Sequence, residues 1–230
     1  MKKIVVLSGA GISAESGLKT FRDANGLWEN HDIMEVASPY GFAKNPELVL
    51  EFYNQRRQQL FEIQPNKAHI ALAQLEADYQ VTIITQNVDD LHERAGSSDV
   101  LHLHGELLKV RSTANPDLIY SWNKKLQLGD LCELNSQLRP HIVWFGEEVP
   151  MLPQAIEITK TADILIIVGT SMQVYPAASL IHFVRSDTLL YLIDPKPALR
   201  NGDLSNLIVL DQPATVGVPV VIEKYLHAQS

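Results

Sequence analysis

The sequence predicts an α/β protein with a Rossmann-like, doubly wound parallel sheet and a smaller inserted module. Four short apolar runs, at residues 4–7, 81–85, 164–168 and 189–193, show no polar alternation, which is typical of strands buried on both faces. Helix-like stretches separate these runs, and such alternation indicates a parallel sheet with helices on both sides. The length of 230 residues suffices for one large core.

The remaining elements follow from periodicity and turn residues. A fifth strand is expected at 207–210. Pro46 suits a first helical turn, and side chains at helical spacing follow it through residue 63. Further helices are predicted at 66–78, 176–185 and 214–227.

Two segments interrupt the alternation and are expected to build the smaller module. Residues 18–46 are rich in Gly, Asn, Asp and Pro, and residues 106–140 show no convincing period. We therefore expect a single domain over residues 1–230. The core should comprise about residues 1–30, 66–105 and 141–230, and the module about residues 31–65 and 106–140.

Composition limits the partners and the compartment. The formal net charge of −8 disfavours nucleic acids and anionic membranes and is compatible with basic, lysine-bearing protein substrates. Cys132 is the single cysteine, which excludes a disulfide framework within the chain and a thiolate-based zinc site. The apolar start is too short for a signal peptide, and no run approaches the ~20 residues of a membrane span. We expect a soluble, cytoplasmic monomer.

A glycine-rich loop follows the first predicted strand. Gly9, Gly11 and Ala14 fit the pattern G-x-G-x-x-G/A, in which the glycines permit a tight turn and close approach of a diphosphate to a helix start. The alternative is a glycine-bearing turn without a ligand. A dehydrogenase would have a second strand soon after this loop, but no strand-like run appears between residues 18 and 80. A bound dinucleotide is therefore not expected to serve hydride transfer.

Five motifs, in order along nearly the whole chain, resemble the signatures of the sirtuin family. The first joins Gly-Ala-Gly-Ile-Ser at 9–13 with Phe-Arg-Asp at 21–23 and Gly-Leu-Trp at 26–28. The others are Thr-Gln-Asn-Val-Asp at 85–89, Leu-His-Gly-Glu at 103–106, Val-Trp-Phe-Gly-Glu at 143–147, and Gly-Thr-Ser at 169–171 with Val-Tyr-Pro at 174–176. The resemblance implies an NAD-dependent protein-lysine deacylase that yields nicotinamide and O-acyl-ADP-ribose.

The resemblance also implies roles for particular residues. Asp89 and the Ile12 backbone would hold the nicotinamide amide, and Asn87 would bind ribose and position a water. His104 would be the general base that takes a ribose hydroxyl proton, a role that suits imidazole near neutral pH. Other interpretations are a turn residue for Asn87, a structural role for His104, and a helix N-cap for Asp89 or, as the better cap, Asp90.

Further cofactor and substrate residues are assigned by the same resemblance. Arg22 would act at the diphosphate and reacting ribose, with Phe21 shielding the site, and Asp194 stands where many sirtuins have asparagine. The full cofactor set is Gly9, Ala10, Gly11, Ile12, Ser13, Phe21, Arg22, Trp28, Gln86, Asn87, Asp89, Gly169, Thr170, Ser171, Asp194, Lys196 and Ala214. The acyl-lysine channel would be lined by Val143, Phe145, Gly146, Glu147, Val174 and Tyr175.

Tyr53 and Arg56 bear on the acyl group. They lie three residues apart on a predicted helix and can point the same way. They resemble the Tyr/Arg pair of the sirtuin class that accepts succinyl- and malonyl-lysine, in which a guanidinium binds the acyl carboxylate and a hydroxyl adds a bond. The alternative is a surface arginine beside a tyrosine packed on the core. We expect acidic acyl groups as well as acetyl.

The segment after His104 lacks the four zinc cysteines that sirtuins of this type normally carry. Cys132 is the only cysteine in residues 106–139, and Ser112 stands where a ligand cysteine is expected. One thiolate and no histidine in that stretch cannot complete a tetrahedral zinc site. We expect a zinc-free module held by apolar packing of Leu118, Ile119, Trp122, Leu126, Leu131, Leu134 and Leu138.

Parts of the sequence also fit three other functions. A metal-dependent hydrolase could use Asp89, His92, His102 and His104 as ligands, since residues two apart on an extended segment share a face, but the glycine loop would then be unexplained. An NAD hydrolase or ADP-ribosyltransferase could use the same scaffold, and the motif at 143–147 favours the deacylase. His104 and Asn87 argue against a non-catalytic nucleotide sensor.

Overall fold

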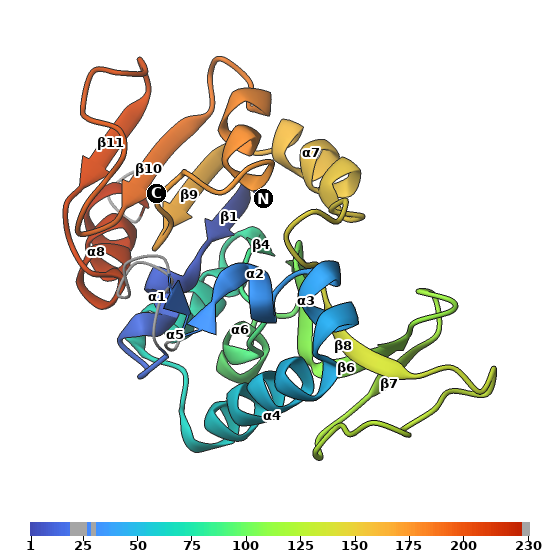
Figure 1. Cartoon of the computed structure of the whole chain (residues 1–230). Helices are drawn as coiled ribbons and strands as arrows, with labels where there is room; N and C mark the ends of the chain where they lie inside the picture. The colour runs from blue at the N-terminus through green and yellow to red at the C-terminus, as the bar shows by residue number, and fades with distance from the viewer. Residues whose placement is uncertain (19–26, 29–30, 227–230) are drawn as a thin grey trace.

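The computed structural model describes residues 1–18, 27–28 and 31–226. Within these residues the larger sheet has six parallel strands in the order β11-β10-β9-β1-β4-β5 (Figure 1). The strands are β1 (Lys3–Ser8), β4 (Gln80–Thr85), β5 (Val100–His102), β9 (Ile164–Val168), β10 (Leu189–Ile193) and β11 (Leu207–Leu210). The five predicted strands are confirmed. The three residues of β5 are too few to produce a recognisable pattern.

The strand order places a reversal of winding beside β1. From β1 the chain adds β4 and then β5 on one side, and it later returns to place β9, β10 and β11 on the other. Numbered along the chain, the order is 3-2-1-4-5-6, which is the arrangement of dinucleotide-binding sheets. In such sheets a ligand binds at the carboxyl ends of the strands where the winding reverses, which here is the junction of β1 and β9.

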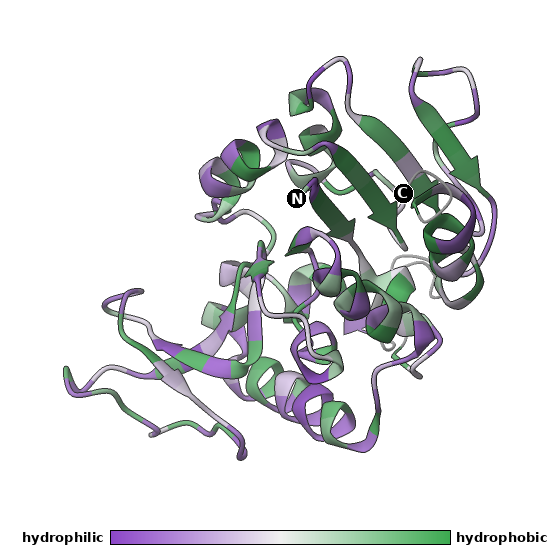
Figure 2. Cartoon of the chain, turned by 180° about the vertical axis from the view of Figure 1, so that it is seen from behind, coloured by the Kyte–Doolittle hydropathy of each residue, from purple (hydrophilic) through white to green (hydrophobic). Residues whose placement is uncertain are grey.

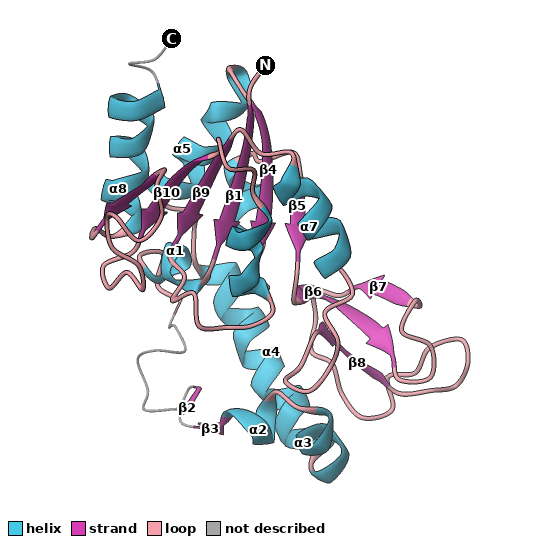
Figure 3. Cartoon of the chain, turned by 90° about the horizontal axis from the view of Figure 1, so that it is seen from above, coloured by secondary structure: helices cyan, strands magenta, loops and turns pink. Residues whose placement is uncertain are grey.

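Helices cover both faces of this sheet (Figure 3). Ile4 and Val6 of β1 pack in a core with helices α5 and α8, whereas Val5 and Leu7 pack on the opposite face with α7 and η3. The covering elements are α1 (Ala10–Ala14), α5 (Lys67–Gln74) with η2 (Leu75–Ala77), α7 (Leu152–Lys160), the 3₁₀ helix η3 (Ala177–Phe183), and α8 (Ala214–Val221) with the π-helix η4 (Ile222–Leu226). The strands are hydrophobic along their length, as expected for a sheet buried on both sides (Figure 2).

The smaller part of the molecule combines helices with an antiparallel sheet (Figure 1). Among the described residues this sheet has three strands in the order β7-β6-β8. Its elements are α2 (Ile33–Val36), α3 (Pro39–Lys44), α4 (Pro46–Glu62), α6 (Leu91–Ala95), β6 (Gly105–Ser112), β7 (Ile119–Ser121) and β8 (Leu138–Ile142). Residues 106–140 thus contain strands that the sequence pattern did not reveal, because β7 has only three residues and the alternation of buried and half-buried side chains in β6 changes phase at Leu108 and Lys109.

One further expectation needs correction. A two-residue antiparallel pair, β2 (Leu27–Trp28) and β3 (His31–Asp32), lies in the stretch where no strand was expected. It does not join the parallel sheet, in which β4 is the next strand after β1. Among the residues that the structure describes, the parallel sheet therefore has no strand between β1 and β4 along the chain. No helix in the described ranges has the length and apolar character needed to cross a membrane.

Apolar packing holds the small sheet only in part. Leu126 and Leu138 are buried together with Leu50 of α4 and with Cys132. Ile119, Leu131 and Leu134 were predicted to pack but are exposed, at 43%, 50% and 55%.

Buried polar side chains of α4 supply much of the remaining attachment. Arg57, 2% exposed, donates from Nε to the Leu107 carbonyl oxygen (3.1 Å) and from Nη1 to that of Lys124 (3.3 Å). Asn54 exchanges two bonds with the Leu126 backbone, at 3.0 and 2.8 Å. Buried carbonyl groups need hydrogen-bond partners. Side chains of α4 therefore bond to backbone groups of the small module that the antiparallel sheet leaves unpaired.

Ser112 and Cys132 meet inside this module. The Cys132 thiol donates to the Ser112 hydroxyl oxygen over 3.2 Å, and both side chains are buried. In the part of the chain that the structure describes, no three side chains of the histidine, cysteine, aspartate or glutamate type are grouped so as to hold a metal ion.

Candidate active site

A cavity of about 690 Å³ lies between the carboxyl ends of the parallel strands and the small module. Its walls come from the segments that follow β1, β4, β9 and β10, from helix α4, and from the segment that follows β8. This volume is within the range of small-molecule and cofactor sites. Its position coincides with the point at which the winding of the sheet reverses.

Most of the predicted site residues line this cavity. From the catalytic and cofactor set these are Gly9, Ala10, Gly11, Ser13, Gln86, Asn87, Asp89, His104, Gly169, Thr170, Ser171, Asp194 and Lys196. From the substrate set they are Tyr53, Arg56, Val143, Phe145, Gly146, Glu147, Val174 and Tyr175. The fold thus brings residues between 9 and 196 of the sequence together in one chamber.

Some predicted residues do not reach the cavity or are not described. Ile12 and Ala214 are buried outside its wall, although Pro213 lines it. Phe21 and Arg22 lie outside the described residues. Trp28 is described only as a residue of strand β2.

The backbone of Ile12 is already bonded within the protein. Its N–H donates to the Gly9 carbonyl oxygen (3.1 Å), and its carbonyl oxygen accepts from the Asn66 side chain (2.8 Å). Both hydrogen-bonding groups of the Ile12 backbone therefore already have a partner within the protein.

The glycine loop is packed tightly against the loop after β9. Gly11 donates its N–H to the Gly169 carbonyl oxygen (2.7 Å), and Gly9 donates to that of Val168 (3.0 Å). A Cβ atom on Gly11 would lie 2.7 Å from the Gly169 Cα, and Gly169 itself has a φ of +62°. The glycines thus allow two strand-end loops to touch at the winding reversal.

A chain of side-chain hydrogen bonds ties the second motif to this loop. Asn87 donates from Nδ2 to the Gly9 carbonyl oxygen (3.2 Å) and to the Ser13 hydroxyl (3.1 Å). Ser13 in turn donates to the Asp89 carboxylate (3.0 Å). Asn87 and Asp89 are therefore held at defined positions on the cavity wall.

Asp89 also meets the start of helix α6. Its Oδ1 accepts from the Leu91 N–H (3.2 Å), whereas Asp90, which stands at the N-cap position, makes no capping bond through its side chain. The expectation that Asp90 is the better cap is wrong, because Asp89 performs that function. Burial raises the pKa of Asp89 to about 6, against the opposing effect of the bonds from Leu91 and Ser13.

His104 has one ring nitrogen assigned by its partner. Nδ1 lies 3.0 Å from the Gln86 carbonyl oxygen, and a carbonyl can only accept, so Nδ1 carries the hydrogen. In the neutral ring Nε2 then bears a lone pair. Burial lowers the pKa of His104, opposed by the bond to Gln86. A neutral imidazole in this tautomer is equipped to accept a proton through Nε2.

His102, two residues earlier, has the opposite character. Nδ1 lies 3.0 Å from the Asn87 carbonyl oxygen and Nε2 lies 2.7 Å from the Glu93 carboxylate. Both partners are acceptors, so both nitrogens carry hydrogen. Burial acts to lower the pKa of His102, but the bond and charge of Glu93 outweigh it and the net shift is upward. His102 is a charged structural residue and does not line the cavity.

The metal-hydrolase alternative fails on these contacts. His92 lies with Nε2 at 2.9 Å from the Ser8 hydroxyl, His102 pairs with Glu93, and His104 bonds Gln86. Each of these histidines thus hydrogen-bonds a different partner. Among the described residues, no group of histidine, cysteine, aspartate or glutamate side chains could hold a metal ion.

Helix α4 brings the Tyr/Arg pair to the same cavity. Tyr53 is fully buried, and its hydroxyl accepts a hydrogen bond from the Trp144 indole (2.9 Å). Arg56 lies one turn away, with its guanidinium carbon 5.0 Å from the centre of the Phe52 ring. Burial raises the pKa of Tyr53, with the Trp144 bond opposing, so the hydroxyl is protonated at neutral pH.

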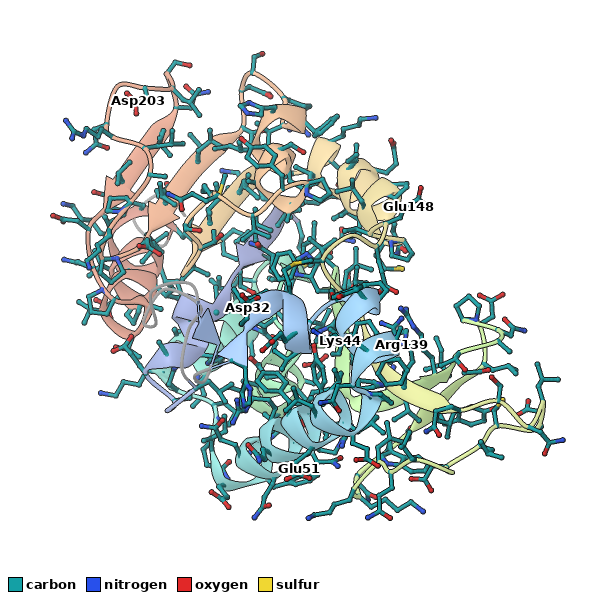
Figure 4. The ribbon with its side chains drawn as sticks, viewed as in Figure 1. Asp32, Lys44, Glu51, Arg139, Glu148 and Asp203 are labelled. Carbon is teal, nitrogen blue, oxygen red and sulfur yellow. The ribbon has the colours of Figure 1, made fainter. Side chains whose placement is uncertain are left out.

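Glu147 lines the cavity but directs its carboxylate to the small module. It accepts from both Nη atoms of Arg139 (2.6 and 3.0 Å), from Arg111 (3.1 Å) and from the Trp144 backbone N–H (2.8 Å). Arg139, labelled in Figure 4, lies in β8 and donates to the Glu147 carboxylate. Glu147, which is expected to line the acyl-lysine channel, therefore also links the segment after β8 to the antiparallel sheet.

A comparison with family models identifies the scaffold. The model of the Sir2 family matches residues 9–176, which is more than half of the chain. The chain belongs to the Sir2 family. Among curated relatives, a protein of Helicobacter pylori (strain ATCC 700392 / 26695) is 71% identical over 231 residues, covering 100% of both chains, and is called NAD-dependent protein deacylase. A Bacteroides thetaiotaomicron protein with the same name is 51% identical over 95% of each chain.

Solved Sir2 structures share the fold over nearly the whole chain. A Sir2 homologue in complex with NAD has a TM-score of 0.86 and 39% identity, covering 100% of this chain and 91% of its own. A variant of a Sir2 homologue in complex with ADP-ribose has a TM-score of 0.88 and 40% identity, covering 99% and 93%.

Sequence reasoning missed several residues that support this Sir2 site. The Ser8 hydroxyl donates to Thr85 Oγ1 (2.9 Å), which also accepts the Asn87 N–H (3.0 Å). His92 completes the group through Ser8. A signal was available, because Ser8 and Thr85 are polar residues at the last positions of two apolar strands. Ser8 directly precedes the first motif, and Thr85 is the first residue of the second.

Proposed function

We propose that this Sir2 protein is an NAD-dependent protein-lysine deacylase that removes succinyl and malonyl groups as well as acetyl groups, with nicotinamide and O-acyl-ADP-ribose as products. The deacylase activity is supported by the two relatives of 71% and 51% identity that carry that name. The acidic acyl preference is supported by Tyr53 and Arg56.

One observation carries the proposal. A single cavity is lined by the glycine loop, by His104 and by the Tyr53/Arg56 pair. A reaction between a dinucleotide and an acyl-lysine needs both reactants and a general base in one chamber. The glycine loop would bind the dinucleotide, the Tyr53/Arg56 pair would bind the acyl group, and His104 would be the base.

The residues present fit NAD. The strand order is that of dinucleotide-binding sheets, and the volume of about 690 Å³ suits a cofactor. Asp194 follows β10 at the cavity wall, where its carboxylate would accept bonds from ribose hydroxyls. Lys196 lies two residues on and would supply positive charge for the phosphates.

When bound, NAD supplies an ADP-ribosyl group with nicotinamide as the leaving group. Asp89, fixed by Ser13 and Leu91, would accept the N–H of the nicotinamide amide as a carboxylate. Asn87, fixed by its bonds to Gly9 and Ser13, would bind ribose. His104 would take a hydroxyl proton on Nε2, since Nδ1 is held by Gln86.

Tyr53 and Arg56 would bind the acyl terminus. A carboxylate moved from water into this cavity needs a counter-charge, and the guanidinium offers parallel N–H donors to both oxygens. Because burial keeps the Tyr53 hydroxyl protonated, it would donate a further bond. An acetyl group has no terminal carboxylate and would leave this pair unused.

The test incubates the purified protein with NAD and matched acetyl-lysine and succinyl-lysine peptides, with products read by mass spectrometry. We expect loss of both acyl groups, one nicotinamide per acyl group, and no reaction without NAD. Arg56→Met should lower kcat/KM for the succinyl peptide about 100-fold, as expected for loss of a charge-assisted bidentate contact.

The same experiment separates the alternatives. Deacylation of neither peptide contradicts the proposal. Release of nicotinamide that is independent of acyl peptide indicates an NAD hydrolase. Unchanged succinyl turnover in Arg56→Met, with deacetylation intact, removes the acidic acyl preference and leaves the deacylase.

A further inference from the structure

Trp144 and Tyr53 join two walls of the cavity through one hydrogen bond. The indole Nε1–H donates to the Tyr53 hydroxyl oxygen over 2.9 Å. Tyr53 belongs to α4, and Trp144 follows β8, 91 residues further along the chain. Their exposures are 0% and 2%, so water does not compete for this bond.

Trp144 is itself held on several sides. The Arg139 guanidinium carbon lies 3.3 Å from the centre of its ring, and Phe42 packs at 5.3 Å between ring centres. Glu147 accepts the Trp144 backbone N–H (2.8 Å) and pairs with Arg139. The indole therefore has one orientation, and its N–H has a fixed direction.

This direction constrains the Tyr53 hydroxyl. An indole N–H can only donate, so the tyrosine oxygen is the acceptor of this bond. The hydroxyl hydrogen is then directed away from the indole. Accepting a hydrogen bond also polarises the hydroxyl and strengthens the bond that it donates.

We propose that Trp144 is a positioning residue for acyl selectivity, which orients the Tyr53 hydroxyl to donate to the terminal carboxylate of an acidic acyl group. This inference rests on the function proposed above. Packing alone does not explain an indole here, because a phenylalanine ring could stack on Arg139 and Phe42 without an N–H that needs a buried partner.

A double-mutant cycle tests the inference. Trp144→Phe, Tyr53→Phe and the double variant are assayed with matched succinyl- and acetyl-lysine peptides. We expect each single substitution to lower the succinyl-to-acetyl ratio of kcat/KM about tenfold, mainly through KM. The double variant should lose no more than the larger single loss, because both substitutions remove the same bond to the substrate.

Trp122→Phe is the matched control. Trp122 lies in the small module outside the cavity, so its substitution should leave the ratio unchanged. If Trp144→Phe does not fold, site-specific replacement of Trp144 by 3-benzothienylalanine keeps the bicyclic ring and exchanges the N–H for sulfur, with the same expected loss.

Three outcomes overturn the inference. An unchanged ratio in Trp144→Phe, when wild-type desuccinylation still depends on Arg56, overturns it and leaves the proposed function. Additive losses in the double variant show that Trp144 does not act through Tyr53. A wild-type protein without desuccinylase activity refutes the proposed acyl preference first, and the inference with it.

Discussion

The Nδ1 atom of His104 lies 3.0 Å from the carbonyl oxygen of Gln86. This contact gives His104 an Nδ1–H tautomer with its lone pair on Nε2, while His102, two residues away, contacts acceptors through both nitrogens. Two histidines close in sequence thus differ in protonation because of the groups that meet them in the fold.

His104→Ala should reduce kcat about 100- to 10,000-fold with little change in binding of NAD, since this is the range that proton transfer to a positioned base contributes. Because burial lowers the pKa of His104, its neutral form persists to pH values below 6.5, and activity should fall only as the pH drops through that lowered pKa. Steady-state rates across pH 5–9 check this. Substantial turnover in the alanine variant would contradict the assignment.

The two histidines should titrate differently in the ¹⁵N spectrum of the ring nitrogens. At pH 6.5 we expect His104 as the neutral Nδ1–H tautomer and His102 as the doubly protonated ring. His102→Asn and His104→Asn assign the signals. Glu93→Gln should shift the His102 titration downward by removing its counter-charge and leave His104 in place. Equal titration of both rings would refute the assignment.

Asp89 should make stability depend on pH in a specific direction. Its folded pKa is raised to about 6 by burial, so its favourable contribution is complete below the unfolded value and is lost as pH rises through 6. Relative to Asp89→Asn, the wild type should lose about 1 kcal/mol of unfolding free energy between pH 5 and 7. Denaturant titrations of both proteins at the two pH values measure this difference. A constant difference would show that the carboxyl group is not perturbed.

Arg57→Met should destabilise the attachment of the small module by about 2–4 kcal/mol, because the buried carbonyl groups of Leu107 and Lys124 lose their donor. Hydrogen exchange should show faster exchange across residues 105–142 than across the parallel sheet. Gln58→Met, on an exposed part of the same helix, is the matched control and should stay within about 0.5 kcal/mol of the wild type. Equal effects would argue against the anchoring function of Arg57.

The purified protein should contain no stoichiometric zinc, and a chelator should leave its melting temperature unchanged. The physical reason is that Cys132 bonds Ser112, and no other thiol exists in the chain to complete a site. Elemental analysis and a thermal melt with and without chelator provide the measurement. One zinc per chain would refute the metal-free module.

The parallel core could be predicted from the sequence because its signals are local. The apolar runs of β1, β4, β9 and β10 bury both faces, and their composition records this directly. The motifs were equally accessible, since each places its residues within a few positions after a strand. Strand β6 escaped prediction because its side chains alternate only in part and its pairing with β8 is interrupted by a register shift between Gly105 and Val110.

By itself the sequence determined the fold class, the family motifs and the residues that reach the cavity, because apolar periodicity and contiguous motifs are properties of short segments. Only the tertiary structure decided how those residues are used. The charge of His102 depends on Glu93, the orientation of Tyr53 depends on Trp144, and the Gly11 N–H is occupied by Gly169. Each of these partners comes from another strand, helix or loop, and protonation, orientation and availability are set by the contacts that folding creates.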